Sequence, residues 1–371
     1  MGHQMSRLLQ DMTSMLSRLL PCVLLNALRL RAQGQPLVVA LGFSAWKEGF
    51  VRRFFADRAV LFVDSPLALK LVARLLKRCD VDYAIWSFRD EALGLDLAVC
   101  SGHAVWHVED GFIRSVGRGL DHVPPWSLCL DRGAYFDASR SSDLEQMLNR
   151  HKPDDLSDAE RATARQLMET LKTLRIDKYN LASTNPASTS APDDLLSIPT
   201  DAILVLGQVE DDFSILRNSN AISTNAGLLQ RAMDENPGRA IFFKQHPDCV
   251  GARKRPGYVA LGGFGGVREI SSSMPVAEAI DAVEMVYTIS SLGGFEALMR
   301  GKKVVTFGAP FYAGWGLTRD HVSFPRRQNR LALDDLFYIA YVAYPHYFNP
   351  HDGTRLEAGD VVRKMMDLRA S

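Results

Sequence analysis

Two groups of carboxylates follow apolar runs, and their spacing could support chemistry. Glu210, Asp211 and Asp212 come just after the run in "LVLGQVEDDFSI", and Glu109 and Asp110 end the run in "HVEDGFIRS". Two carboxylates at one sugar carbon can serve as nucleophile and as general acid and base. Either cluster alone is more simply a solvated turn or a helix cap. Two clusters after two strands, in different halves of the chain, favour a catalytic pair.

A third stretch, "FFKQHPD", could bind an anionic group. Lys244 and His246 are two residues apart, so they would lie on the same side of a strand that continued that far. Pro247 disfavours a helical conformation for His246 and holds it near the strand end. Both side chains suit a phosphate. The alternative is a surface histidine in a turn.

A fourth stretch, "TISSLGGFEALMRGKKV", predicts a helix that begins directly after a strand. Ser290 or Ser291 would cap it, and the free N–H groups of its first turn could bind phosphate. Glu296, in the second turn, could hold ribose hydroxyls. Ordinary capping with a surface glutamate is the alternative. A fifth stretch, "FGAPFYAGWGLT", combines aromatic residues and glycines without a period and predicts a shaped loop that could wall a cleft.

Short apolar runs alternate with helix-like segments over most of the chain. Such alternation predicts parallel sheets covered by helices on both faces. Ser65 can cap one of these helices, with Pro66 at its first position. Further helices are expected at about 141–175, 221–235 and 292–300. The strand candidates are 36–42, 59–64, 83–88, 104–108, 202–207, 240–246, 284–290 and 303–308.

A chain of 371 residues is long enough for two domains. The segment "NLASTNPASTSAPDD" is rich in Ser, Thr, Pro and Ala and predicts a linker. We therefore expect an N-terminal α/β domain at 1–194 that ends in this linker and a C-terminal α/β domain at 195–371, with the final helices crossing back. Two Rossmann-like domains with a cleft between the lobes make a glycosyltransferase-B-like layout, and its ligands bind at the carboxyl ends of the strands.

Composition excludes several other classes. Lys plus Arg number 43 and Asp plus Glu number 43, so overall charge gives no support for a nucleic-acid partner. Five scattered cysteines form no C-x-x-C pair, which argues against disulfides and zinc and fits a reducing cytoplasm. No G-x-G-x-x-G or Walker lysine follows a strand, so we expect no dinucleotide cofactor.

The segment 5–31 has apolar residues at helical spacing, with Arg7, Arg18, Arg29 and Arg31 between them. It predicts a helix packed on the domain. The alternative is a helix that lies on an anionic membrane surface. The most apolar early run, "LLPCVLLNAL", is about half of the ~20 residues that span a bilayer, and no signal-peptide layout is present. We expect a cytoplasmic protein, with the cytoplasmic face of the inner membrane as an alternative.

The stretches "EDGFIRSVG", "GQVEDDFSI", "KQHPD", "SSLGGFEALMRGKKV" and "PFYAGWG", in this order, resemble the capsule polysaccharide β-Kdo transferases of the KpsC type. The resemblance covers roughly residues 100–345. It implies a glycosyltransferase-B-like enzyme that transfers Kdo from CMP-β-Kdo with retention. Family members build a β-Kdo linker on a lyso-phosphatidylglycerol lipid. They usually carry two modules in tandem, whereas this chain holds one.

The resemblance also implies roles for individual residues. Asp212, chosen over Asp211, would be the nucleophile that forms a covalent Kdo intermediate, and Glu109 would be the acid/base. Phe213 departs from the family pattern, where a small residue is expected. The CMP-binding residues would be Gln208, Lys244, His246, Pro247, Ser290, Ser291, Gly293 and Glu296. Asp110, Arg114, Tyr312 and Trp315 would line the acceptor site or cleft.

The expected partners are CMP-β-Kdo and a Kdo-terminated glycolipid or glycan, with other capsule enzymes as further candidates. No metal is expected, because the leaving group carries a single phosphate. A 2,4 linkage is favoured over a 2,7 linkage. One alternative is another CMP-sugar transferase of the sialyl type. The other is a non-catalytic sugar-nucleotide-binding component of a capsule export complex.

Overall fold

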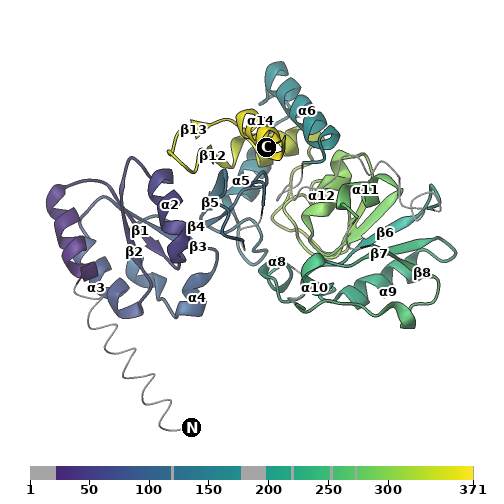
Figure 1. Ribbon diagram of the computed structural model, residues 1–371, viewed down its shortest axis with the longest axis horizontal. Coiled ribbons are helices and arrows are strands. Elements are labelled where there is room, and N and C mark those ends of the chain that lie inside the picture. Colours follow the sequence, from purple (N-terminus) through teal and green to yellow (C-terminus); the bar gives the residue numbers. More distant parts are fainter. Residues whose placement is uncertain are drawn as a thin grey trace, which may run out of the picture. The chain divides into compact units, whose positions relative to one another are not determined.

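The computed structural model of the 371-residue chain describes residues 22–117, 121–176, 198–218, 221–250, 254–271 and 274–370. Contacts within the chain divide it into two units. Unit 1 comprises Met1–Ala134 and Pro345–Val361, and unit 2 comprises Tyr135–Tyr344 and Val362–Ser371. Each unit has its own sheet (Figure 1).

Unit 1 contains a seven-stranded sheet with the order β13-β12-β5-β4-β3-β1-β2. The strands β1 to β4 run parallel, while β5, β12 and β13 each pair antiparallel with a neighbour. From β2, the first five strands follow the 2-1-3-4-5 order of flavodoxin-like sheets. The strands are β1 (Leu37–Leu41), β2 (Ala59–Val63), β3 (Val81–Trp86), β4 (Val105–Asp110), β5 (Ser127–Asp131), β12 (His346–Phe348) and β13 (Arg355–Leu356).

Helices cover both faces of this sheet, so β1 is buried on both sides. Leu37, Val39 and Leu41 pack in one core with α3 (Pro66–Leu76) and with the helical residues 22–33. Val38 and Ala40 point to the opposite face and pack with α2 (Glu48–Phe54). The predicted start of α3 is confirmed, since Ser65 Oγ accepts from Ala68 N and Pro66 is the first helical residue. The short helix α4 is Arg89–Leu93.

Unit 2 contains a six-stranded sheet in which every pairing is parallel. Its order is β11-β10-β9-β6-β7-β8, which from β8 is the 3-2-1-4-5-6 order of doubly wound dinucleotide-binding sheets. The two Rossmann-like domains that the sequence predicted are confirmed. The strands are β6 (Ile203–Leu206), β7 (Ile241–Lys244), β8 (Val267–Ile270), β9 (Met285–Thr288), β10 (Lys303–Thr306) and β11 (Arg319–Asp320).

Helices α9 and α12 lie on opposite faces of the sheet of unit 2. Leu228, Leu229 and Ala232 of α9 (Asn225–Glu235) share a core with Ile203 and Val205. On the other face, α12 (Leu292–Met299) contacts β9 and β10, and α11 (Val276–Asp281) contacts α12. The short helices α8 (Phe213–Leu216) and α10 (Pro247–Val250) follow β6 and β7.

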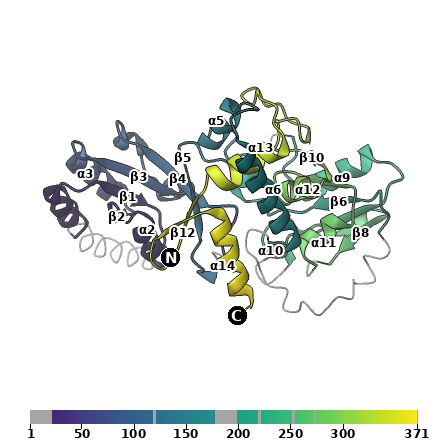
Figure 2. The same ribbon diagram turned by 90° about the horizontal axis from the view of Figure 1, so that it is seen from above.

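A group of helices before and after this α/β core completes unit 2. Helix α6 lies along α13, and Arg161 of α6 pairs with the buried Asp335 of α13 (Figure 2). A π-helix, Tyr338–Ala343, extends α13. The helices are α5 (Asp143–Arg150), α6 (Asp158–Thr173), α13 (Leu333–Phe337) and α14 (Ala358–Ala370), which continues from unit 1.

The division between the units differs from the boundary at residue 194 that the sequence suggested. The first crossing falls between Ala134 and Tyr135, because the charged helices α5 and α6 contact α13 and the π-helix. After Tyr344 the chain returns to unit 1 with β12 and β13. The predicted linker at 180–194 lies outside the described residues.

The N-terminal helix expected over 5–31 is described only from residue 22. There, Ala27 is fully buried, and Arg31 Nη1 donates to Leu75 O at 3.0 Å, so these residues pack on α3. Arg7 and Arg18 lie outside the described residues. In the part of the chain that the structure describes, no helix is long and apolar enough to cross a membrane.

Candidate functional site

The strand order of unit 2 reverses at β6, which has β7 on one side and β9 on the other. In open parallel sheets, ligands bind outside the carboxyl ends of the strands at such a switch point. Gln208 follows β6, and Ser290 follows β9. The structure therefore brings together two residues that the sequence assigned to CMP binding.

Gln208 joins these two strand ends through its side chain. Its Oε1 accepts from Ser290 N at 2.9 Å and from Thr288 Oγ1 at 3.1 Å, and its Nε2 donates to Ser290 Oγ at 3.2 Å. Ser290 Oγ in turn donates to Ser214 O at 2.6 Å. Both Gln208 and Ser290 are buried. They hold the strand ends in register, which is a positioning role.

Asn225, which the sequence analysis missed, fixes the backbone of Gln208. Its Oδ1 accepts from Gln208 N at 2.9 Å, and its Nδ2 donates to Gln208 O at 2.7 Å and to Gly257 O at 2.6 Å. A Cβ on Gly257 would lie 2.5 Å from Gln208 O, and its φ of +123° also favours glycine. The sequence signal for Asn225 was weak, because asparagine is common near a helix start.

The three neighbouring carboxylates have different environments. Glu210 Oε1 accepts from Asn225 N at 2.7 Å, and the exposed Asp211 pairs with Arg255 at 2.6 Å. Asp212 caps α8, where its Oδ1 accepts from Ser214 N at 2.9 Å. Asp212 is half-buried, and within the described residues its second oxygen accepts no hydrogen bond. Of the three carboxylates, Asp212 is the one whose charge acts on His246.

His246 lies close enough to Asp212 for the carboxylate charge to raise the pKa of the imidazole. Burial lowers the pKa of His246, while Asp248 and Asp212 oppose the shift and Arg255 adds to it. The imidazole is therefore neutral at pH 7. Its Nδ1 accepts from Asp248 N at 3.2 Å, which leaves the proton on Nε2 as a donor for a ligand. Pro247 begins α10, so His246 lies at the strand end, as predicted.

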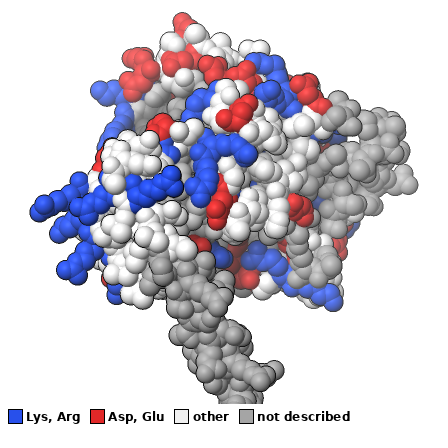
Figure 3. Space-filling view, turned by 60° about the vertical axis from the view of Figure 1, so that its left-hand side comes forward, with Lys and Arg blue, Asp and Glu red and all other residues white. Residues whose placement is uncertain are grey.

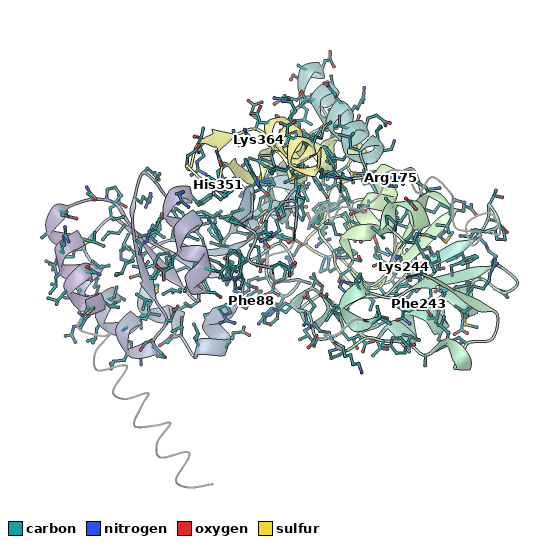
Figure 4. The ribbon with its side chains drawn as sticks, viewed as in Figure 1. Phe88, Arg175, Phe243, Lys244, His351 and Lys364 are labelled. Carbon is teal, nitrogen blue, oxygen red and sulfur yellow. The ribbon has the colours of Figure 1, made fainter. Side chains whose placement is uncertain are left out.

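Lys244, the last residue of β7, is a buried cation (Figure 4). Phe243 packs in the core on the α9 side, so Lys244 lies on the other face of the sheet. Burial lowers the pKa of Lys244 to about 8, and its Nζ donates to Ser271 O at 2.9 Å. An anionic ligand near this amine would raise its pKa back toward the ordinary value of a lysine.

Helix α12 begins at the same switch point. Ser291 is its N-cap and accepts from Gly293 N at 3.1 Å, which confirms one of the two serines predicted as the cap. A Cβ on Gly293 would lie 2.8 Å from Leu206 Cδ1. The N-terminal turn therefore packs closely against β6, and a larger residue here would have to displace the Leu206 side chain.

Glu296 lies more than one turn after Ser291, away from the first turn of α12. It lines a cavity of about 30 Å³ together with Arg300 and Arg175. Arg175 is labelled in Figure 4. A cavity of this size accommodates about one water molecule. Glu296 lies in the second turn of α12, as predicted, and its role in binding ribose stays a prediction.

Tyr312 and Trp315 are enclosed within unit 2, although the sequence suggested that they line a cleft. Their exposed fractions are 0% and 1%. Tyr312 Oη donates to Ser291 O at 2.5 Å, and Trp315 Nε1 donates to Phe311 O at 2.7 Å. Tyr312 packs in an aromatic cluster around Phe295, and the Arg327 guanidinium lies over the Trp315 ring, 5.6 Å from its centroid.

Glu109, Asp110 and Arg114 belong to unit 1. The two acids are the last residues of β4, as predicted. Arg114 is 1% exposed, and its Nε donates to Asp110 Oδ2 at 2.6 Å while its Nη2 donates to Val123 O at 2.9 Å. Arg114 thus orients the Asp110 carboxylate and holds the following loop in place through Val123 O, which is a positioning role.

Lys47 is a further candidate, and the sequence analysis missed it. It ends a 3-10 turn, Ala45–Lys47, that follows β1. Burial lowers its pKa to about 7, against the opposing charges of Asp110 and Glu109. The sequence offered one signal, a lysine shortly after a buried strand, which is a weak signal because such a lysine is usually solvated. Among the described residues, no cluster of three or more His, Cys, Asp or Glu could hold a metal ion.

Comparison with known proteins gives consistent matches. The family model "Capsule polysaccharide biosynthesis protein" matches residues 96–349. The lipopolysaccharide-processing protein LpsZ of Rhizobium meliloti is 35% identical over 326 residues, which cover 84% of this chain and 70% of LpsZ. The capsule polysaccharide modification protein LipA of Neisseria meningitidis serogroup B is 36% identical over 86% of this chain. The match spans 44% of LipA.

Two solved structures of KpsC from Thermosulfurimonas dismutans are also similar. The one titled as the β-Kdo 2,4 transferase has a TM-score of 0.68 and 28% identity, and covers 90% of this chain and 98% of that one. The one titled as the β-Kdo 2,7 transferase has a TM-score of 0.71 and 29% identity, and covers 90% and 99%. This similarity confirms the glycosyltransferase-B-like fold that the sequence predicted.

Proposed function

Because the chain belongs to the capsule polysaccharide biosynthesis protein family of the KpsC type, we propose that it is a retaining β-Kdo transferase. It moves Kdo from CMP-β-Kdo to a Kdo- or lipid-linked glycan in capsule or surface polysaccharide synthesis. The titles of the two KpsC structures support Kdo as the sugar. The observation that carries the proposal is the position of Asp212 at the switch point of unit 2, where its charge acts on His246.

The donor binds through its single phosphate. His246 donates from Nε2, and the first turn of α12 presents backbone N–H groups. Lys244 supplies a positive charge, since a phosphate raises the pKa of this amine from about 8. These groups act without a metal, so chelation with EDTA leaves turnover unchanged in this proposal.

The reaction proceeds by double displacement. The Asp212 carboxylate attacks the anomeric carbon, and the bond from that carbon to the phosphate oxygen breaks, so CMP leaves with the electron pair. Glu109 then takes the proton of the acceptor hydroxyl as this oxygen attacks the same carbon, and the Asp212 carboxylate leaves. Two inversions at one carbon give net retention.

Asp212→Asn tests the nucleophile, and Asp211→Asn is its matched control. We expect Asp212→Asn to abolish transfer from CMP-Kdo to a Kdo-terminated acceptor, while Asp211→Asn keeps most of the activity, because Asp211 pairs with an exposed arginine. Mass spectrometry of the products, with and without EDTA, measures this. Wild-type-like turnover by Asp212→Asn would remove the nucleophile role.

Glu109→Gln tests the covalent intermediate. Without its base the second step slows, so the protein gains the mass of one Kdo when it is mixed with CMP-Kdo. Peptide mapping should place the added mass on Asp212. Label on Asp211 or Glu210 would move the nucleophile. No label, with an active wild type that makes a β-linked product, would favour a front-face mechanism.

A donor panel and product analysis test the remaining parts of the proposal. CMP-sialic acid as a better donor than CMP-Kdo would indicate a sialyl-type transferase. Binding of both donors without transfer would indicate a non-catalytic component of an export complex. We propose a 2,4 linkage, which NMR of the product distinguishes from 2,7.

A further inference from the structure

The sheet of unit 1 has its own switch point, between β1 and β3. Ligands of flavodoxin-like sheets bind outside the carboxyl ends of the strands at this place. The turn after β1 ends at Lys47, and β3 ends at Trp86. Lys47 Nζ lies 2.9 Å from the centroid of the Trp86 ring, so this pair bridges the switch point.

Lys47 is a buried cation without a close counterion. It is 8% exposed, and in the described part of the chain its Nζ lies within 4.0 Å of no carboxylate oxygen. Two aromatic faces surround the amine, with the Trp46 ring centroid at 5.4 Å. Cation–π contacts offset only part of the cost of burying an ammonium group. Such a group is a candidate for binding an anion.

An exposed aromatic surface adjoins Lys47. Trp46 stacks on the exposed His122, with ring centroids 5.0 Å apart and an interplanar angle of 15°. His122 has a φ of +60°, a left-handed conformation that costs free energy in a residue other than glycine. Small-molecule sites combine such flat apolar faces with a few fixed polar groups.

We propose that this edge of unit 1 is the subsite for the acceptor's terminal sugar acid, whose carboxylate Lys47 binds while its ring packs against the stacked pair of Trp46 and His122. The inference rests on the proposed function, because an acceptor that ends in Kdo carries a carboxylate on the sugar ring. Glu109 and Asp110 of β4 lie near Lys47 and would repel that carboxylate. Lys47 therefore lets an anionic acceptor approach an acidic catalytic edge.

The protonation of Lys47 adds a pH dependence. Its pKa of about 7 results from burial, with Asp110 and Glu109 raising it and Arg114 and Arg89 lowering it further. A bound carboxylate raises the pKa again, so binding at pH 8 takes up a proton. Acceptor affinity should therefore be constant below pH 7 and weaken as the pH rises above it.

The test is acceptor binding by titration calorimetry, in saturating CMP, with a Kdo-terminated disaccharide as the free acid and as its primary amide. The wild type should bind the acid about tenfold or more tightly than the amide. Lys47→Met should lose this preference because its affinity for the acid alone falls. Lys47→Arg should retain most of the preference. Lys70→Met, an exposed lysine of α3, is the matched control and should behave as the wild type.

Equal binding of acid and amide by the wild type would overturn the inference, and this comparison needs no variant to fold. An unchanged preference in Lys47→Met would do the same. Competition by glycerol phosphate but not by the disaccharide acid would assign the subsite to a phosphate instead. The proposed function would fail by a different result: the wild type would prefer the acid to the amide in binding but would transfer no Kdo.

Discussion

Asp212 differs from its two acidic neighbours only through contacts that the fold creates. Glu210 is held by the backbone of Asn225, 15 residues away, and Asp211 is paired with Arg255, 44 residues away. The sequence located the acidic cluster, because a carboxylate run after a buried strand is a local pattern. The choice of Asp212 among the three rested on family resemblance. The geometry adds an independent reason, because Asp212 is the one of the three whose charge acts on His246.

Lys47, Tyr312 and Trp315 show where residue-level prediction fails. A lysine after a strand is usually solvated, and its burial against Trp86 depends on the pairing of β1 with β3. Tyr312 and Trp315 stand in a glycine-rich loop without a period, so nothing local indicated that both side chains would be buried. In each case the exposure of the side chain is decided by a distant segment.

His246→Ala should weaken binding of CMP about tenfold or more, because the phosphate loses a charge-assisted hydrogen bond of roughly 1.5–3 kcal/mol. Calorimetry with CMP measures the change. His321→Ala is the control, since His321 also lies in unit 2 with its pKa lowered by burial but stacks on Phe307 beside β11. Unchanged affinity in His246→Ala would reassign His246 to a structural turn.

At the scale of elements, local signals predicted the parallel strands and the capped helices. The strand expected at 36–42 is β1, and the helix expected at 292–300 is α12 with Ser291 as its cap. The strands β5 and β8 were missed. β5 is held by antiparallel pairing with β4, and β8 has two exposed residues at the edge of its sheet, so neither has the apolar run of a central strand.

Helix α3 exposes a basic surface that the sequence analysis did not single out. Its lysines and arginines at 70, 74 and 77 are exposed and share one helical face, and the helix carries no acidic residue. Residues 22–33, which pack on α3, expose Arg29 and Arg31 together with Leu25 and Leu28. Figure 3 shows groups of Lys and Arg on its left-hand part, with few Asp or Glu among them. This surface suits an anionic bilayer, where each such cation contributes about 1 kcal/mol.

We expect the full chain to sediment with vesicles that contain phosphatidylglycerol, and to be released at high salt. Replacing Lys70, Arg74 and Lys77 by Gln should lower the bound fraction. So should replacing the four N-terminal arginines Arg7, Arg18, Arg29 and Arg31. The control removes three exposed cations of unit 2, namely Arg268, Lys303 and Arg330. Equal binding by all variants, or none by the wild type, would leave residues 22–33 with a packing role alone.

At the scale of the whole molecule, the sheet of unit 1 is completed by the far end of the chain. β12 pairs with β5, and Phe348 at its end is fully buried against Phe54 of α2, with ring centroids 5.0 Å apart. Arg355 Nη2 also donates to Phe54 O at 2.9 Å. A two- or three-residue strand that pairs across more than 200 residues leaves no periodic signal, so the sequence suggested only that the C-terminus crosses back.

Phe348→Ala should therefore destabilise unit 1, although residue 348 follows the whole of the sheet of unit 2 in the chain. Truncating a buried phenylalanine costs roughly 3–5 kcal/mol. Four of the five tryptophans, at 46, 86, 106 and 126, lie in unit 1, so in a Trp315→Phe background fluorescence reports unit 1 alone. Urea titration should show a lower midpoint for Phe348→Ala in that background, with the slope unchanged.

CMP binding provides the comparison for unit 2. With Trp315 intact and no urea, Phe348→Ala should bind CMP as the wild type does, because Gln208, Lys244, His246 and α12 all belong to unit 2. Tyr258→Ala, which removes a ring that is 58% exposed, should leave the fluorescence midpoint in place. If Phe348→Ala unfolds at the wild-type midpoint, β12 is peripheral to unit 1. If it loses CMP binding without urea, the stability of unit 2 depends on the strand that closes unit 1, and the chain behaves as one cooperative body.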